Sequence, residues 1–163
     1  MEAVEDLEKI KNLMYEYGYA FDEDRIDDFV ACFTEDCVGE YSPFTKSFNK
    51  RSEISEFARG VKGVHPLLTS TFHVTVSPVI EVDGTHATGR WNWMNPCTLE
   101  RVPGQPVSAW QYGVYECKYR KEREGWKISH VKVTYLAAFE LLKGWANQPM
   151  LIVGGVDSTS LPA

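Results

Sequence analysis

The sequence predicts an α+β fold in which helices come first and a long antiparallel sheet follows. In the N-terminal third, apolar residues recur at steps of three and four, which is typical of helices with one buried face. From about residue 67 onward, apolar and polar residues alternate, which is the period of strands. Helical and extended segments are thus separated along the chain, as in α+β proteins.

Three helices are expected. The first spans residues 4–21, and a short second one spans 26–33. A short strand is expected over 37–41, and a third helix over 52–61. The apolar stripe of the first helix consists of Val4, Leu7, Ile10, Met14, Tyr17 and Phe21. The polar residues 42–50 have the composition of a loop.

Four long β segments are expected over residues 67–82, 85–99, 107–121 and 125–138. Asp83-Gly84 is a hairpin signal between the first two, so the natural pairing is an antiparallel meander. Strands of this length must bend, and a bent sheet around a long helix leaves a cavity at its open end. Residues 1–150 are therefore expected to form one α+β domain, and residues 151–163 a C-terminal tail.

Composition narrows the classes of function. The net charge is −6, whereas nucleic-acid binding and polybasic membrane anchoring both need a basic surface. No signal peptide or membrane span is apparent, and four cysteines without CxxC spacing indicate reduced thiols, so a cytoplasmic protein is expected. The aromatic content of 13% can supply the walls of a ligand site as well as a core.

Strand alternation assigns several side chains to one face of the sheet. Tyr135 lies on the apolar face of the last β segment, and Tyr115 on the uncharged face of the third. Trp91, Trp93 and Asn95 share one face of the second segment, which we take as the inward face. Aromatic side chains on this face are expected to shape the cavity.

His73 is not placed by the pattern. Its neighbours Phe72 and Val74 form the apolar face of the first β segment, so strict alternation would turn His73 outward. Pro78 cannot donate to a strand ladder and indicates an edge or a bulge nearby. Either orientation of the imidazole therefore remains open.

Four segments of the chain resemble a known superfamily. They are IKNLMYEYGYAFDEDRIDDF, FHVTVSP, ATGRWNW and GWKISHVKV, in that order. With these segments the chain resembles the SnoaL-like branch of the nuclear-transport-factor-two-like superfamily. Within that branch it is most similar to scytalone dehydratase, bile acid 7α-dehydratase and hexachlorocyclohexane dehydrochlorinase. The resemblance implies a cone-shaped α+β barrel with an apolar pocket, lyase activity without a cofactor, and a homo-oligomer, with a trimer favoured over a dimer.

The resemblance also implies catalytic residues. The family's catalytic histidine matches His73, and the aspartate that orients it, at the end of the first helix, matches Asp22. A tyrosine of the bile acid enzyme matches Tyr17, and a substrate-binding tyrosine of scytalone dehydratase matches Tyr41. For both tyrosines, plain core packing is the alternative.

Two positions depart from the relatives. Asn95 falls where the bile acid enzyme has an aspartate, and Tyr135 falls near an arginine that two relatives carry. The site has thus lost an acid and a base. Asn95 either holds a substrate carbonyl or is a polar residue next to a proline turn, while Trp91, Trp93 and Tyr115 are expected to line the substrate.

The chemistry implied is removal of a proton from carbon. Histidine is the side chain whose ordinary pKa suits a base near neutral pH, and a carboxylate on one ring nitrogen fixes the tautomer. The alternative is that His73 is a half-buried strand residue bonded to backbone, with Asp22 a solvated acid or a helix cap. No metal or nucleotide cofactor is expected, because the histidines lack ligand spacing and no glycine-rich turn opens a helix.

The expected function is a dehydratase-type lyase acting on a mostly apolar, hydroxylated ring compound such as a polyketide, steroid or terpenoid. An isomerase or cyclase using the same base is the second hypothesis. A non-catalytic ligand-binding or assembly module is the third. Whether the product has lost water distinguishes the first two, and substitution of His73 tests the third.

Overall fold

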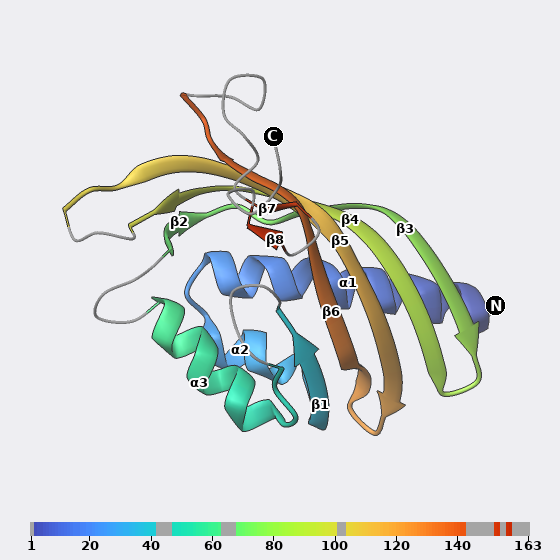
Figure 1. Ribbon diagram of the computed structural model, residues 1–163. Coiled ribbons are helices and arrows are strands. Elements are labelled where there is room, and N and C mark those ends of the chain that lie inside the picture. Colours follow the sequence, from blue (N-terminus) through green and yellow to red (C-terminus); the bar gives the residue numbers. More distant parts are fainter. Residues whose placement is uncertain are drawn as a thin grey trace.

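The computed structural model describes residues 2–41, 47–62, 68–100, 104–142, 152–153 and 156–157 of the chain. Six of the described strands form one sheet in the order β1-β6-β5-β4-β2, with β3 also paired to β4. The sheet curls into a half-barrel, and the helices lie on its concave side (Figure 1). The predicted α+β fold, with helices packed in a curved antiparallel sheet, is therefore confirmed.

Three helices precede most of the sheet: α1 (Glu2–Asp22), α2 (Ile26–Ala31) and α3 (Arg51–Lys62). The long α1 runs along the inside of the curved sheet (Figure 1). Its predicted stripe is buried at Ile10, Met14, Tyr17 and Phe21. The stripe orients α1 so that its last turn, which ends at Asp22, meets the edge of the sheet formed by β2 and β3.

The start of α1 departs from the prediction. Val4 is 64% exposed, whereas Asp6 is buried. Asp6 Oδ1 accepts a hydrogen bond of 2.9 Å from Trp126 Nε1, and Oδ2 accepts one of 2.9 Å from Lys121 Nζ. A buried carboxylate with two donors replaces an apolar contact here, and hydropathy alone does not predict this.

Strand β1 (Phe33–Glu40) begins earlier than predicted and shortens the second helix. It pairs in parallel with β6 (Gly125–Glu140), with Val38 opposite His130. The partner lies far along the sequence, so the local pattern did not predict the pairing. Within the predicted loop, Phe48 forms a bridge to Gly39, while residues 42–46 lie outside the described part.

The first predicted β segment is in fact two strands, β2 (Leu68–Thr71) and β3 (Val74–Asp83). Both pair antiparallel with β4 (His86–Leu99). Phe72 and His73 lie between the two strands, and the register to β4 is the same before and after them. The bulge expected near Pro78 is confirmed by a register shift between Val76 and Val79.

Strand β5 (Val107–Glu122) joins β4 to β6 in the predicted antiparallel meander. Its register against β6 shifts at Gly113, where a Cβ atom would lie 1.9 Å from the carbonyl oxygen of Thr134. The two backbones approach so closely that only glycine fits. Such bulges allow long strands to bend into the half-barrel.

The chain beyond residue 142 is described only at β7 (Ile152–Val153) and β8 (Val156–Asp157), which pair antiparallel. The proposed tail boundary at residue 151 stays a prediction, because most of the residues around it lie outside the described part. All four cysteines are free and buried. None of the described helices combines the length and apolar character needed to cross a membrane.

Candidate active site

His73 points into the half-barrel, on the same strand face as the buried Thr71. Phe72, the apolar neighbour, is 59% exposed, whereas the His73 side chain is only 12% exposed. The backbone N–H of Phe72 donates to the carbonyl oxygen of Pro96 and to Asn95 Oδ1, both at 3.2 Å. These bonds hold the step against β4, and the register is the same on both sides of it, with Thr71 opposite Cys97 and Val74 opposite Met94. The orientation that the sequence pattern left open is therefore inward.

Asp22 meets His73 at two points. Its Oδ1 lies 2.5 Å from His73 Nδ1, and its Oδ2 accepts the backbone N–H of His73 at 2.6 Å. Thr71 Oγ1 donates a third hydrogen bond of 2.6 Å to Oδ1. The side chain of Asp22 is 11% exposed, so these donors replace most of its water. The structure thus brings together the histidine and the aspartate that the resemblance indicated.

Hydrogen bonding keeps Asp22 ionised. Burial raises the pKa of the carboxyl. The hydrogen bond and the charge interaction with His73, together with the hydrogen bond from Thr71, lower the pKa by more than burial raises it. The net pKa of Asp22 therefore lies below its usual value of 3.8. A carboxylate can only accept hydrogen bonds, so Nδ1 of His73 carries the proton and Nε2 carries the lone pair.

Asn95 lies at the other nitrogen of the ring. Its Nδ2 is 3.4 Å from His73 Nε2, and it is buried. Because its Oδ1 accepts from the backbone of Phe72, its amide N–H groups face the imidazole. This sets Nε2 as an acceptor, which is the state a general base requires.

Four phenols gather on the same interior face. The hydroxyl groups of Tyr17 and Tyr41 lie 3.3 Å apart, and the ring of Tyr17 meets Tyr115 edge-on at 5.8 Å. Trp93 stacks on Tyr115 at 5.4 Å and meets Tyr135 edge-on at 4.9 Å. Burial raises the pKa of all four tyrosines, so their phenols stay protonated at neutral pH. They can donate hydrogen bonds but are poor bases.

The phenols and the dyad are parts of one interior surface. Tyr17 and Phe21 lie one turn apart on α1, and the ring of Phe21 meets His73 edge-on at 5.5 Å. Trp93 and Asn95 share the buried face of β4. Of the predicted residues, Asn95 contacts His73. The others form one linked aromatic cluster: Tyr17, Tyr41, Trp93, Tyr115 and Tyr135.

Trp91 has different surroundings. It lies on the same face of β4, but its Nε1 donates to the hydroxyl of Tyr119 at 2.9 Å. Its ring meets Tyr15 of α1 edge-on at 6.2 Å. Its polar atom is thus already used in packing the core. The indole Nε1 of Trp93, in contrast, is buried and has no hydrogen-bond partner among the described residues.

Sequence reasoning missed three residues next to these groups. Thr71 shares a strand face with His73, which was a usable signal, but its bond to Asp22 was not predicted. Lys62, at the end of α3, contacts Thr71 with its amine at 3.4 Å, and nothing in the local pattern indicated this. Gln111 is buried opposite Asn95 on β5 and donates to Cys97 Sγ at 3.4 Å.

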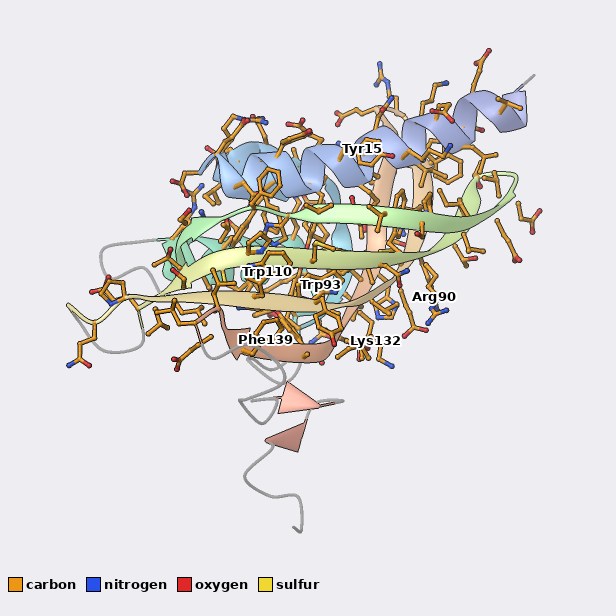
Figure 2. The ribbon with its side chains drawn as sticks, turned by 90° about the horizontal axis from the view of Figure 1, so that it is seen from above. Tyr15, Arg90, Trp93, Trp110, Lys132 and Phe139 are labelled. Carbon is orange, nitrogen blue, oxygen red and sulfur yellow. The ribbon has the colours of Figure 1, made fainter. Side chains whose placement is uncertain are left out.

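A groove of about 420 Å³ lies elsewhere, on the outer face of the sheet. It is lined largely by charged side chains of the central strands, including Arg90, Glu116, Lys118 and Lys132. Arg90 of β4 and Lys132 of β6 are labelled in Figure 2, and each alternates with buried residues of its strand. Within the described part of the chain, no three His, Cys, Asp or Glu side chains group closely enough to hold a metal ion.

Solved structures share this fold. A candidate scytalone dehydratase from Novosphingobium aromaticivorans is 20% identical, with a TM-score of 0.74 over 85% of this chain and 89% of that one. A candidate aromatic ring hydroxylase from the same organism is 23% identical, with a TM-score of 0.73 over 86% and 96%. A type 2 hexachlorocyclohexane dehydrochlorinase is 16% identical, with a TM-score of 0.74 over 85% and 90%. No curated protein matches the sequence.

The family model of the SnoaL-like domain matches residues 2–132. This range includes both members of the His73–Asp22 pair and all of the helices that cover the sheet. Together with the shared fold, the match confirms the superfamily that the sequence segments indicated. The chain belongs to the SnoaL-like domain family.

Proposed function

We propose that this protein is a cofactor-independent lyase of the dehydratase type, in which His73 removes a proton from carbon. The observation that supports this most directly is the double contact of Asp22 with the ring and the backbone of His73. It fixes the ring, places the proton on Nδ1 and leaves Nε2 as an acceptor on the inner side of the half-barrel. A histidine with only a structural role in a strand would not require a fixed ring, a defined tautomer and an inward acceptor nitrogen.

The proton and electrons balance as follows. His73 Nε2 takes the proton from a carbon next to the one that bears a hydroxyl group. The electron pair of that C–H bond becomes the new double bond, and the C–O bond breaks with its electrons on oxygen. The imidazolium then returns its proton to the departing oxygen, so that water leaves and the base is restored. Asp22 stabilises the imidazolium between these steps.

Oxygen atoms of the substrate are held by neutral donors. The buried phenols of Tyr17 and Tyr41 are protonated and lie next to each other, so they can donate to a carbonyl oxygen as negative charge develops on it. Asn95 can bind a second oxygen through its amide. A neutral, aromatic interior suits a mostly apolar ring compound such as a polyketide, steroid or terpenoid. The dehydratase and dehydrochlorinase names among the structural neighbours are consistent with this class.

The test compares two histidines that each face a carboxylate. His73→Ala removes the proposed base, whereas His130→Ala removes an outward histidine whose Nε2 lies 2.6 Å from Glu40 Oε1. Each variant is incubated with a panel of hydroxylated ring ketones, and products are followed by mass spectrometry for the loss of one water. We expect His73→Ala to lower turnover by at least about 10²-fold and His130→Ala to leave it near the wild-type value.

Added imidazole should restore part of the activity of His73→Ala, because the removed base then returns in solution. A second assay follows exchange of carbon-bound protons in D₂O with ring ketones that lack the hydroxyl group. Exchange that depends on His73, without water loss from any hydroxylated ketone, would indicate an isomerase or cyclase instead. Equal behaviour of His73→Ala and wild type in both assays would leave a non-catalytic binding module.

A further inference from the structure

Lys62 ends helix α3 with its amine turned inward. Its side chain is only 7% exposed, although a lysine in the last helical turn ordinarily extends into water. The amine lies 2.9 Å from Asp24 Oδ1 and 3.4 Å from Thr71 Oγ1. It also lies 5.1 Å from the centre of the Phe21 ring, the same ring that contacts His73. A cation is thus held one hydroxyl group away from the Asp22–His73 pair.

The direction of every hydrogen bond in this chain of contacts follows from its ends. An ammonium group can only donate, so Thr71 Oγ1 accepts from Lys62. The single hydroxyl proton of Thr71 is then free to point at Asp22 Oδ1. Asp22 accepts this bond together with those from His73. Lys62 of α3 thus donates to Thr71 of β2, and Thr71 in turn donates to the carboxylate of Asp22 on α1.

Among the cations near the Asp22–His73 pair, Lys62 is the least exposed to water, so its charge is screened least. Asp24, its partner in the turn after α1, is 68% exposed and so offsets the buried cation incompletely. Arg25 is paired with Glu16, Glu23 and Asp28, and Arg59 of α3 is paired with Asp27. From β4, the group facing the imidazole is the neutral Asn95. Lys62 is therefore the charge best placed to influence the dyad from outside.

We propose that Lys62 is a positioning residue that acts through Thr71: it fixes the hydroxyl as a donor to Asp22 and lowers the affinity of His73 for a proton. An effect of Lys62 on catalysis rests on the proposed function, whereas its effect on the proton affinity of His73 does not. A nearby cation opposes formation of the imidazolium, and a carboxylate with an additional donor attracts the imidazolium less. Both effects keep His73 in its free-base form to lower pH.

The test is an NMR titration of the free protein labelled with ¹⁵N in its histidines. Lys62→Met removes the cation while keeping the length of the side chain. The titration midpoint of His73 should move upward by roughly half a pH unit or more. Arg59→Met is the matched control, because it removes one positive charge from an exposed position on the same helix. It should leave the midpoint where it is in the wild type.

Thr71→Val and Thr71→Ser distinguish the effect of the hydrogen bond to Asp22 from the effect of side-chain packing. Valine has nearly the shape of threonine but cannot donate to Asp22, so the midpoint should again rise, whereas serine keeps the hydroxyl and should restore the wild-type value. These variants also decide the question if Lys62→Met does not fold. An unchanged His73 midpoint in folded Lys62→Met, or in Thr71→Val, would overturn the proposal.

The two proposals fail in different measurements. The titration needs no substrate, so a shifted midpoint together with full activity of His73→Ala would refute the enzymatic role alone. Conversely, loss of activity in His73→Ala with no shift in Lys62→Met would refute only the role of Lys62. Where turnover is found, the acid limb of kcat/KM should move upward with the NMR midpoint in Lys62→Met.

Discussion

Gly18 of α1 lies directly against His73: a Cβ atom at position 18 would be 3.2 Å from His73 Cβ. The missing side chain is what allows the helix to approach the strand edge closely enough for Asp22, one turn later, to reach the ring. The absence of a side chain at Gly18 thus permits the short distance between α1, which carries Asp22, and the chain at His73.

Gly18→Ala should separate stability from activity. Alanine favours the helix interior by roughly 0.5–1 kcal/mol, which offsets the cost of a tight contact, so the free energy of unfolding should change little. The displaced imidazole should lower turnover about three- to tenfold, since small shifts of catalytic groups are costly. The control is Gly60→Ala in α3, where a Cβ meets nothing within 4 Å. It should gain roughly 0.5–1 kcal/mol in urea unfolding with unchanged turnover.

Asp22→Asn should impair catalysis through the tautomer of His73. The amide can donate to Nδ1, which moves the ring proton to Nε2 and removes the basic lone pair. Turnover should drop by at least about 10²-fold, and ¹⁵N shifts should report a protonated Nε2. Asp28→Asn, which changes an exposed acid of the same run, should leave both observations unaltered. Wild-type turnover in Asp22→Asn would show that the aspartate does not orient the base.

The decrease in the free energy of unfolding at low pH should also depend on Asp22. Because its folded pKa is below the unfolded value of about 3.9, its contribution is complete above that pH and is lost as the pH falls through the folded pKa. The free-energy difference between wild type and Asp22→Asn should therefore be largest above pH ~4 and shrink toward pH ~2. Guanidinium unfolding across this range measures it. A constant difference would mean that the pKa of Asp22 is the same in both states.

Gly113→Ala should unfold the sheet rather than affect catalysis selectively. Its Cβ would lie 1.9 Å from the carbonyl oxygen of Thr134, and neither backbone can withdraw without breaking the β5–β6 ladder. A loss of at least about 3 kcal/mol in the free energy of unfolding is expected, as for other backbone clashes. Thermal unfolding followed by circular dichroism measures it. A melting temperature close to that of wild type would show that the bulge can relax.

Elements with a strong local period were predictable from the sequence. Helix α1 and strands β4, β5 and β6 lie close to their predicted ranges, because burial of one face imposes a period that the residues display. The start of β1 and its parallel pairing with β6 were missed, since the partner is distant in the chain. Asp6 was missed because two hydrogen bonds from other elements, and not hydropathy, decide its burial.

The candidate site was predictable only where a family pattern supplied what periodicity could not. Hydropathy would have turned His73 outward, because it assigns Phe72 and Val76 to the buried face, whereas both are exposed in the structure. Thr71 and Lys62 carry no pattern of their own. Their place beside Asp22 results from the packing of three elements, which no local window of sequence contains.

The continuous register from β2 to β3 also makes the site sensitive to chain length. Thr71 and His73 are two residues apart on one face, and both donate to Asp22. Each strand has its own ladder to β4, so both ladders could survive the loss or gain of one residue between Thr71 and His73. The two side chains would then lie on opposite faces, and Asp22 would lose one of its donors although the architecture is kept.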